Sequence, residues 1–336
     1  MKRKRMPGRP LPVTGVRWGN IAPYARSRNF ELRAEQGRND LSKRFVKKYR
    51  TKRAFKWLKR QLLPVGVRAA KVHRKWRRKD LGDWPPEGTD PAAGIGQYEY
   101  GCLSQNGEDG IIRFVFSEIG FESRRFVEFG FGATQCNSLR LMLHERFQGL
   151  LMDGSAENCD FFNRAARKRG LAGVEAFCTF LTRENLNETI RQRGVSGDID
   201  FLSLDVDGND YWFWEALDCV SPRLVCIEYN AGIGPSLSWT VPYDPQFERY
   251  AKHPSGFFHG ASLRALGSLG VKKGYRLAGC DSTGTNAFFL REDVPAPALP
   301  TLTAAEAFRP HQNWLGRGFS EAEQLEIMKS MPYVEV

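Results

Sequence analysis

Acidic residues stand at the ends of three apolar segments of this sequence. Asp153 ends one such segment, Asp205 and Asp207 follow a second, and Glu228 lies near the end of a third. If the segments are parallel strands, their carboxyl ends share one edge of an open α/β sheet, which is where ligands bind. Carboxylates at that edge can accept hydrogen bonds from hydroxyl groups or take a proton from a reacting group. The sequence therefore predicts a polar functional site there.

The segment Arg125–Gly132 is an apolar run that ends in Glu128 and two glycines one residue apart. With the amphipathic segment Ser138–Phe147 after it, the pattern predicts a strand, a tight turn and a helix, the opening unit of a Rossmann-like domain. Glycine tolerates a positive φ and lets the backbone come close to a ligand. Alternatively, Gly130 and Gly132 serve only to pack the turn.

Position 135 separates two cofactor classes. The dinucleotide fingerprint requires a third glycine three places after the second, and this chain has Gln135 there. Nicotinamide and flavin dinucleotides are therefore disfavoured, whereas an acid before the turn, as Glu128 stands here, is typical of S-adenosylmethionine enzymes. Asp153 follows the glycines by about 20 residues, where Rossmann-like domains place the carboxylate that binds ribose hydroxyls.

Asp205 and Asp207 come directly after the apolar run of residues 199–204. Because they are two apart, both side chains face the same way if the strand stays extended. The D-x-D pattern resembles a calcium loop, but Asp210 occupies the position where such loops require glycine. The alternative is that a carboxylate here only caps the following helix.

Charge is distributed unevenly along the 336 residues. The net charge is +12, yet residues 1–80 carry 27 Lys/Arg against 4 Asp/Glu and the remainder carries 23 against 34. We expect a basic, partly disordered or helical arm with its linker over residues 1–90. Its interleaved aromatic residues suit an anionic membrane surface or a nucleic acid. A solvated arm, or a helix docked on the acidic body, is the alternative.

Targeting signals and cysteine pairing indicate in which cellular compartment a protein resides. The seven cysteines show no C-x-x-C pair, which predicts free thiols in a reducing environment. No window approaches 18 consecutive apolar residues, and the basic start of the chain is followed by prolines and glycine, with no apolar signal core. A cytoplasmic protein is expected, with peripheral membrane association left open.

Strand and helix patterns alternate from residue 111 to residue 290. They predict an α/β fold: a Rossmann-like, seven-stranded, mostly parallel sheet with helices on both faces and a C-terminal antiparallel hairpin. We expect this domain to span residues 91–295 and a helical tail to span residues 296–336. The segment 231–259 lacks periodicity, and connections of that length are usually functional.

Five motifs follow one another along the chain: Ser104-Gln-Asn-Gly-Glu-Asp109, Val127-Glu-Phe-Gly130, Ile199-Asp-Phe-Leu-Ser-Leu-Asp-Val-Asp-Gly208, Ile227-Glu-Tyr-Asn230 and Gly284-Thr-Asn-Ala-Phe-Phe289. In combination they resemble the FkbM-type methyltransferases and their uncharacterised relatives. The resemblance covers about residues 95–295 and none of the basic arm.

The resemblance implies S-adenosylmethionine as cofactor and methyl transfer to an oxygen, often a hydroxyl of a sugar or secondary metabolite. By position, it implies that the methionine moiety is lined by Glu128, Gly130 and Gly132. It also implies that Asp153 binds the ribose and that Asp205 and Asp207 face the reaction centre. The chain departs from many relatives at Ala133–Cys136, where they continue with another glycine or an acid.

A hydroxyl acceptor requires a general base within hydrogen-bond reach. The candidates are Asp205, Asp207 and His259, with His253 less favoured. A magnesium-assisted variant with Asp205, Glu228 and Asn230 remains an alternative, although no metal is assigned. Two other functions also remain open: a catalytically silent fold that acts as a binding or assembly module, and an RNA-binding or RNA-modifying protein. The sequence does not identify the acceptor or the oligomeric state.

Overall fold

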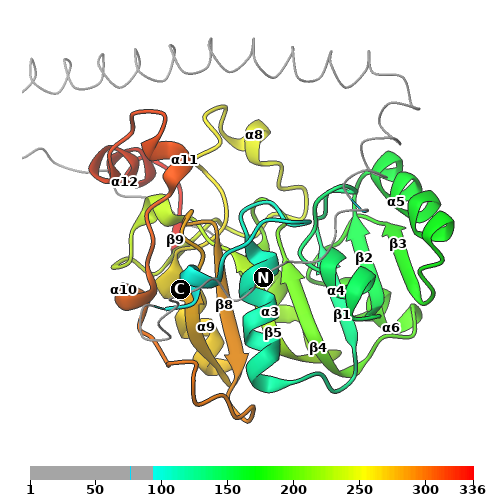
Figure 1. Ribbon diagram of the computed structural model, residues 1–336. Coiled ribbons are helices and arrows are strands. Elements are labelled where there is room, and N and C mark those ends of the chain that lie inside the picture. The colour runs from blue at the N-terminus through cyan, green and yellow to red at the C-terminus, as the bar shows by residue number, and fades with distance from the viewer. Residues whose placement is uncertain (1–75, 77–93) are drawn as a thin grey trace, which may run out of the picture. The chain divides into compact units, whose positions relative to one another are not determined.

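The computed structural model describes residue 76 and residues 94–336, and it places one seven-stranded sheet at the centre of the fold (Figure 1). The strand order is β3-β2-β1-β4-β5-β8-β7. Strand β8 runs antiparallel to both of its neighbours, and the other pairs are parallel. The predicted mostly parallel sheet with a C-terminal antiparallel hairpin is therefore confirmed. The predicted basic arm lies outside the described residues, except for Trp76.

The strands are mostly buried, except for the edge strand β3. They are β1 (Arg125–Phe129), β2 (Gln148–Asp153), β3 (Val174–Cys178), β4 (Gly197–Leu204), β5 (Val220–Glu228), β7 (Tyr275–Cys280) and β8 (Asn286–Arg291). The connecting helices are α3 (Glu108–Ile119), α4 (Leu139–His144), α5 (Ala156–Arg169), α6 (Leu186–Gln192), α7 (Asp210–Ala216) and α9 (Leu263–Lys272).

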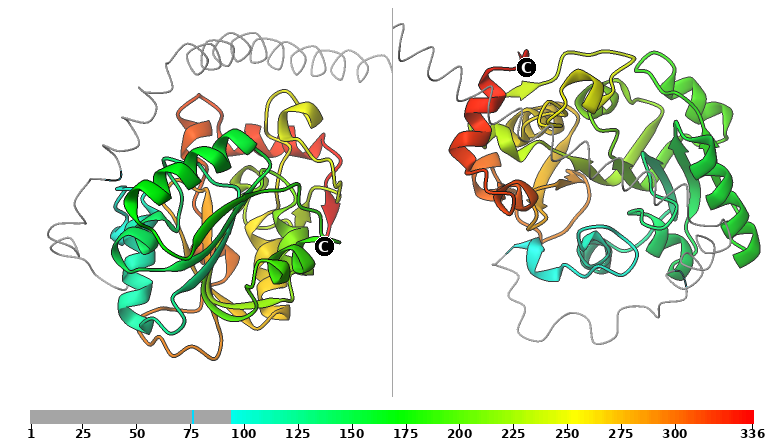
Figure 2. Two further views of the ribbon diagram at one scale, coloured as in Figure 1. Left: turned by 90° about the vertical axis from the view of Figure 1, so that its right-hand side faces the viewer. Right: turned by 90° about the horizontal axis from the view of Figure 1, so that it is seen from above.

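Helices cover both faces of the sheet, as predicted (Figure 2). Side chains alternate along each strand, so Phe126 enters the core shared with α3, α4 and α5, whereas Val127 enters the core shared with α6, α7 and α9. The same alternation holds for Phe288 and Phe289 in β8. Burial of strands on both faces explains why they read as continuous apolar runs.

The Ser104–Asp109 motif builds the entry to α3. Asp109 accepts hydrogen bonds from the backbone N–H groups of Cys102 and Ser104, and the Ser104 hydroxyl accepts one from the N–H of Asp109. Glu108 accepts a hydrogen bond from the side chain of Asn286 in β8. The motif therefore fixes the loop before α3 and joins the start of this helix to β8.

The remaining short elements are η2 (Ile95–Tyr98), η3 (Ala231–Ile233), β6 (Trp239–Thr240), α8 (Arg249–Lys252), α10 (Ala304–Ala307), α11 (Gln312–Leu315), α12 (Glu321–Lys329) and β9 (Val334–Glu335). A capping box at Ser320 opens α12. The segment after β5 packs against the C-terminal segment, where η3 contacts α12 and β6 pairs antiparallel with β9. The C-terminal residues thus hold the long connection between β5 and α9 in place.

None of the helices in the described part of the chain has the length and apolar character needed to cross a membrane. All seven cysteines lie in this part and are free, and Cys178 is the exposed one. Trp76, one of the aromatic residues of the basic segment, is buried against Phe162, with ring centroids 5.4 Å apart.

Candidate active site

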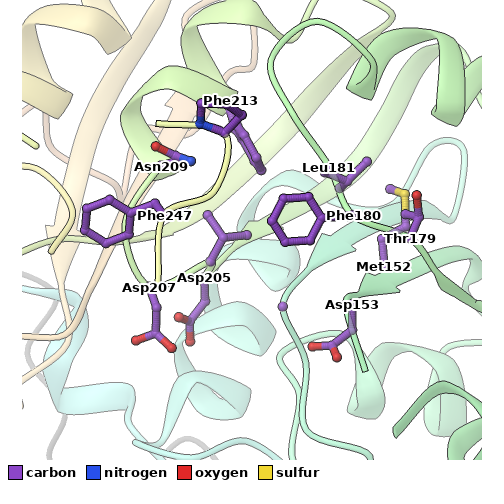
Figure 3. A pocket seen from close by; sticks show the side chains of 14 residues that line it. Met152, Asp153, Thr179, Phe180, Leu181, Asp205, Asp207, Asn209, Phe213 and Phe247 are labelled. Atoms are coloured by element: carbon purple, nitrogen blue, oxygen red, sulfur yellow. The ribbon is translucent and has the colours of Figure 1, made fainter. Parts of the chain in front are cut away.

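A pocket lies at the carboxyl edge of the sheet, across the ends of β1, β2, β3 and β4 (Figure 3). Its volume is about 220 Å³, and acidic groups lie at its two ends with aromatic and aliphatic side chains between them. The lining residues are Gly130, Met152, Asp153, Gly154, Thr179, Phe180, Leu181, Asp205, Val206, Asp207, Asn209, Phe213, Pro245 and Phe247. The sequence-predicted residues Gly130, Asp153, Asp205 and Asp207 are therefore brought together here.

Gly130 is the point where three strand ends meet. Its φ is +67°, and its N–H donates to the carbonyl of Met152 at 2.9 Å. A Cβ at this position would lie 1.7 Å from the carbonyl oxygen of Asp205. Only glycine fits, because the backbone is left-handed and the ends of β1 and β4 touch.

Glu128 and Gly132, by contrast, are not among the described residues that line the pocket. The Glu128 carboxylate is buried and accepts hydrogen bonds from the N–H groups of Asn137 and Ser138 and from the Ser138 hydroxyl. Gly132 exchanges two backbone hydrogen bonds with Gln135, at 2.9 and 3.1 Å. Both residues therefore build the turn between β1 and α4, and their contact with a cofactor stays a prediction.

Asn158 of α5 holds the backbone after β1. Its Oδ1 accepts a hydrogen bond from the N–H of Ala133 at 3.0 Å, and its Nδ2 donates to the carbonyl of Phe131. The turn at Gly132 is therefore fixed from both sides by one side chain.

Glu128 should make stability depend on pH. Burial raises the pKa of its carboxyl to about 7, against hydrogen bonds from Ser138 and Asn137 that lower it. The folded state then holds the proton more tightly than the unfolded state, so the stability contributed by this group is lost as pH rises from about 4.5 to 7. The loss is on the order of 3 kcal/mol.

Urea unfolding of wild type and Glu128→Gln between pH 4.5 and 8 measures this effect. The stability advantage of wild type over the variant should shrink across that window and stay constant above it. A difference that does not change with pH would contradict the assignment.

Asp205 and Asp207 lie on the same side of the pocket, next to each other (Figure 3). The backbone does not stay extended between them, because the φ of Asp207 is +60°. Both side chains are reached by solvent. Protein nevertheless replaces much of the water around Asp205, and this burial, together with the charges of Asp207 and Asp210, raises the pKa of Asp205 well above its ordinary value.

Asp210 holds the turn that presents these two residues. Its carboxylate accepts hydrogen bonds from the N–H groups of Val206 and Gly208 at 2.9 and 3.0 Å. It is fully buried at the start of α7. Asp210 thus has the structural role, and Asp205 and Asp207 are left facing the pocket.

Glu228, at the end of β5, joins Asp205 and Asp207 in one acidic cluster. One carboxylate oxygen from each of the three lies within 4.8 Å of the others. Arg249 contacts this cluster from the long connection, with Nη1 2.7 Å from Asp207 Oδ1 and 3.5 Å from Glu228 Oε1. Burial and the charge of Asp205 raise the pKa of Glu228 well above its ordinary value, against the opposing effect of Arg249.

His259 was predicted as a candidate base and lies behind Glu228. It is 1% exposed and does not line the pocket in the described structure. Its Nδ1 is 3.8 Å from Glu228 Oε2. Burial, with the nearby charge of Arg249, lowers the pKa of His259 well below its ordinary value, so the ring is neutral. His253, the less favoured candidate, contacts the Ser255 hydroxyl through Nδ1 at 2.6 Å.

Asn230 does not contribute an oxygen to the acidic cluster. Its Oδ1 accepts from the N–H of Gly232 at 3.1 Å, and its Nδ2 donates to the carbonyls of Phe257 and His259 and to the Tyr333 hydroxyl. The buried amide therefore joins β5, the long connection and the C-terminal segment. The metal-assisted alternative from sequence used Asp205, Glu228 and Asn230, whereas the acidic cluster in the structure is Asp205, Asp207 and Glu228.

Asp153 ends β2 at the other end of the pocket. Its Oδ1 accepts a hydrogen bond from the N–H of Ser155 at 2.7 Å. An ionised carboxylate can accept about four hydrogen bonds, so the group retains capacity for hydroxyl donors in the pocket.

Phe180 and Phe247 line the pocket and were not predicted as site residues. Phe180 is 62% exposed and lies two residues beyond the end of β3, but in the sequence it continues the apolar run of that strand. Phe247 comes from the connection without periodicity, as does Arg249, which contacts the acidic cluster.

Comparisons with known proteins find solved structures of similar fold. No family model and no curated protein matches the chain. A SAM-dependent methyltransferase from Aquifex aeolicus is 16% identical over 60% of this chain and 98% of that chain, with a TM-score of 0.34. The N-terminal domain of EvdMO1 with SAH bound is 12% identical over 68% of this chain and 95% of that chain, with a TM-score of 0.38.

The StiE O-MT is 14% identical over 50% of this chain, with a TM-score of 0.31. The matched part spans about half (52%) of that chain. At these identities the likeness concerns the fold, and function has to be argued from the site.

Proposed function

We propose that the protein is an S-adenosylmethionine-dependent methyltransferase that methylates a hydroxyl group of a sugar or other small or glycan acceptor, as FkbM-type enzymes do. The observation that carries the proposal is the pocket at the sheet edge, with Asp153 at one end, Asp205 and Asp207 at the other, and apolar side chains between them. These groups suit the parts of the cofactor: a carboxylate for the ribose hydroxyls, apolar side chains for the aromatic base, and negative charge for the cationic sulfonium.

The residues present fit that cofactor. Asp153 can accept hydrogen bonds from ribose hydroxyls through its remaining capacity. Phe180 and Leu181 offer apolar surface for the base. Gly130 brings bare backbone to the pocket wall. The carboxylates of Asp205 and Asp207 supply negative charge for the sulfonium end.

When bound, the cofactor supplies an activated methyl group for in-line displacement by the acceptor oxygen. The protein must position that oxygen and remove its proton. Asp205 and Asp207 line the pocket and are therefore the candidates to receive the proton, whereas buried His259 can act only through Glu228.

Transfer of a labelled methyl group tests the proposal. Incubation with methyl-labelled cofactor and a panel of sugar and glycan acceptors should give a base-stable labelled ether on at least one acceptor. Label that appears on nitrogen, or on no member of the panel while the cofactor binds, would contradict the proposed acceptor class.

Phe180 should contribute to binding and little to folding. The pocket volume of about 220 Å³ is below the usual range of about 300–1,000 Å³ for small-molecule sites, so a nucleoside would be only partly enclosed. We expect the exposed ring of Phe180 to stack on the base, which is worth about 1–3 kcal/mol.

Phe180→Ala should therefore weaken cofactor binding about 10- to 100-fold with an unchanged unfolding midpoint. Tyr100→Ala is the matched control, because Tyr100 is also exposed, at 45%, and lies outside the pocket lining. Equal affinities of the two variants would remove Phe180 from the cofactor site.

A further inference from the structure

The acidic cluster of Asp205, Asp207 and Glu228 has the spacing of a cation site. One oxygen from each residue lies within 4.8 Å of the other two. Two oxygens on opposite sides of a single ion are separated by about twice the metal–oxygen distance. This oxygen–oxygen separation is about 4.2 Å for Mg²⁺ and about 5 Å for Ca²⁺. The three oxygens can therefore share one ion of this size.

The charges near the cluster do not balance. Three carboxylates face one guanidinium, that of Arg249. With all three ionised, two negative charges remain uncompensated by it. One divalent cation among the three oxygens would balance them.

His259 and Glu228 provide a second, independent observation. His259 is 1% exposed, and neither of its ring nitrogens has a hydrogen-bond partner in the described part of the chain. Glu228 Oε2 is also buried without such a partner there. Its separation of 3.8 Å from His259 Nδ1 is too long for a hydrogen bond. Unsatisfied buried polar groups are uncommon and call for an explanation.

We propose that Asp205, Asp207 and Glu228 bind one divalent cation of the oxygen-preferring class, such as Mg²⁺ or Mn²⁺. His259 is a positioning residue behind Glu228, in the way that outer-shell groups orient carboxylate ligands. Arg249 is the competing cation, since its guanidinium contacts two of the three ligands.

One consequence rests on the proposed function. Asp205 and Asp207 line the pocket, so the ion would lie beside the acceptor and lower the pKa of its hydroxyl. A ligand set made only of oxygens would favour acceptors with neighbouring hydroxyl groups. Binding of the ion itself does not depend on methyl transfer.

The experiment is a titration of the chelator-treated full-length protein with Mn²⁺, followed by the EPR signal of the free ion, without cofactor or acceptor. We expect one site per chain, with Mg²⁺ competing. Asp205→Asn and Glu228→Gln should each weaken Mn²⁺ binding at least tenfold while circular dichroism stays unchanged. Asp218→Asn is the control, because it removes one carboxylate from the exposed ion pair with Arg191.

Arg249→Gln separates a metal site from an ion-pair network. Removing the competing charge should strengthen Mn²⁺ binding several-fold. The proposal is overturned if neither wild type nor Arg249→Gln binds Mn²⁺ at millimolar concentration, or if Asp205→Asn and Glu228→Gln bind it as wild type does. Because no cofactor is present, failure to bind S-adenosylmethionine leaves this result intact.

The role of His259 has its own readout. His259→Phe should weaken Mn²⁺ binding and change the EPR spectrum of the bound ion, whereas His259→Gln, which retains a donor, should restore both. Identical spectra for wild type and His259→Phe would show that His259 only fills space.

Discussion

Gly130→Ala is expected to destabilise the protein by about 3 kcal/mol or more and to abolish cofactor binding. Two penalties combine at this residue. Its φ of +67° is unfavourable for alanine, and the added Cβ would lie 1.7 Å from the Asp205 carbonyl oxygen. Relief of that overlap requires the ends of β1 and β4 to separate, which displaces Asp205 from the pocket.

Gly170→Ala is the matched control for the backbone penalty. Gly170 also has a φ of +67°, but a Cβ there would meet no atom within 4 Å. It should cost only about 1–2 kcal/mol and leave cofactor affinity unchanged. Urea unfolding and cofactor titration measure both variants, and equal stability losses would refute the close approach of β1 and β4.

Asp205→Asn should lower the rate constant of methyl transfer by about 10²- to 10⁴-fold, with little change in affinity for the demethylated cofactor, which carries no sulfonium charge. The isosteric amide keeps the shape of the residue at the end of β4 but cannot receive a proton. It also removes a charged oxygen from the cluster with Asp207 and Glu228. The substitution should lower the rate of the chemical step whether Asp205 takes the proton or holds a cation.

The control for Asp205→Asn lies at the opposite end of the same strand. Asp198 pairs with Arg291 and is 70% exposed, so Asp198→Asn should retain full activity. Single-turnover transfer of the labelled methyl group, at saturating cofactor, compares the two variants. If Asp205→Asn retains wild-type turnover, Asp205 has no role in the reaction.

The strand-end carboxylates could be predicted because parallel strands share one carboxyl edge. Asp153, Asp205 and Glu228 each follow a buried apolar run, and that pattern is visible in sequence. The third member of the cluster, Asp207, was predicted from an extended backbone, whereas the chain turns there with a φ of +60°. Proximity was predicted correctly although the local geometry was not.

The role of Glu128 could not be read from its position before the glycines. A carboxylate at that place can face a ligand or accept hydrogen bonds from the next helix, and the choice depends on where the backbone of Ser138 lies. The structure places the N–H of Ser138 2.9 Å from Glu128 Oε2. Only the three-dimensional path of the turn contains that information.

Residues from the long connection were beyond prediction for a different reason. Arg249 and Phe247 belong to a segment with no hydrophobic period, and their place depends on packing against the C-terminal residues. Tyr333, for instance, donates to the carbonyl of Phe257 at 3.0 Å. His259 was predicted as a candidate base, and the structure buries it because this packing covers it.

Calorimetric titration with the demethylated product of S-adenosylmethionine tests most directly whether the pocket at the sheet edge binds this cofactor. Wild-type protein should bind one equivalent. Asp153→Ala should bind at least tenfold more weakly, and Asp160→Asn, an exposed acid of α5 outside the pocket lining, should bind as wild type does. Folded wild-type protein that releases no heat at high micromolar ligand would contradict the claim.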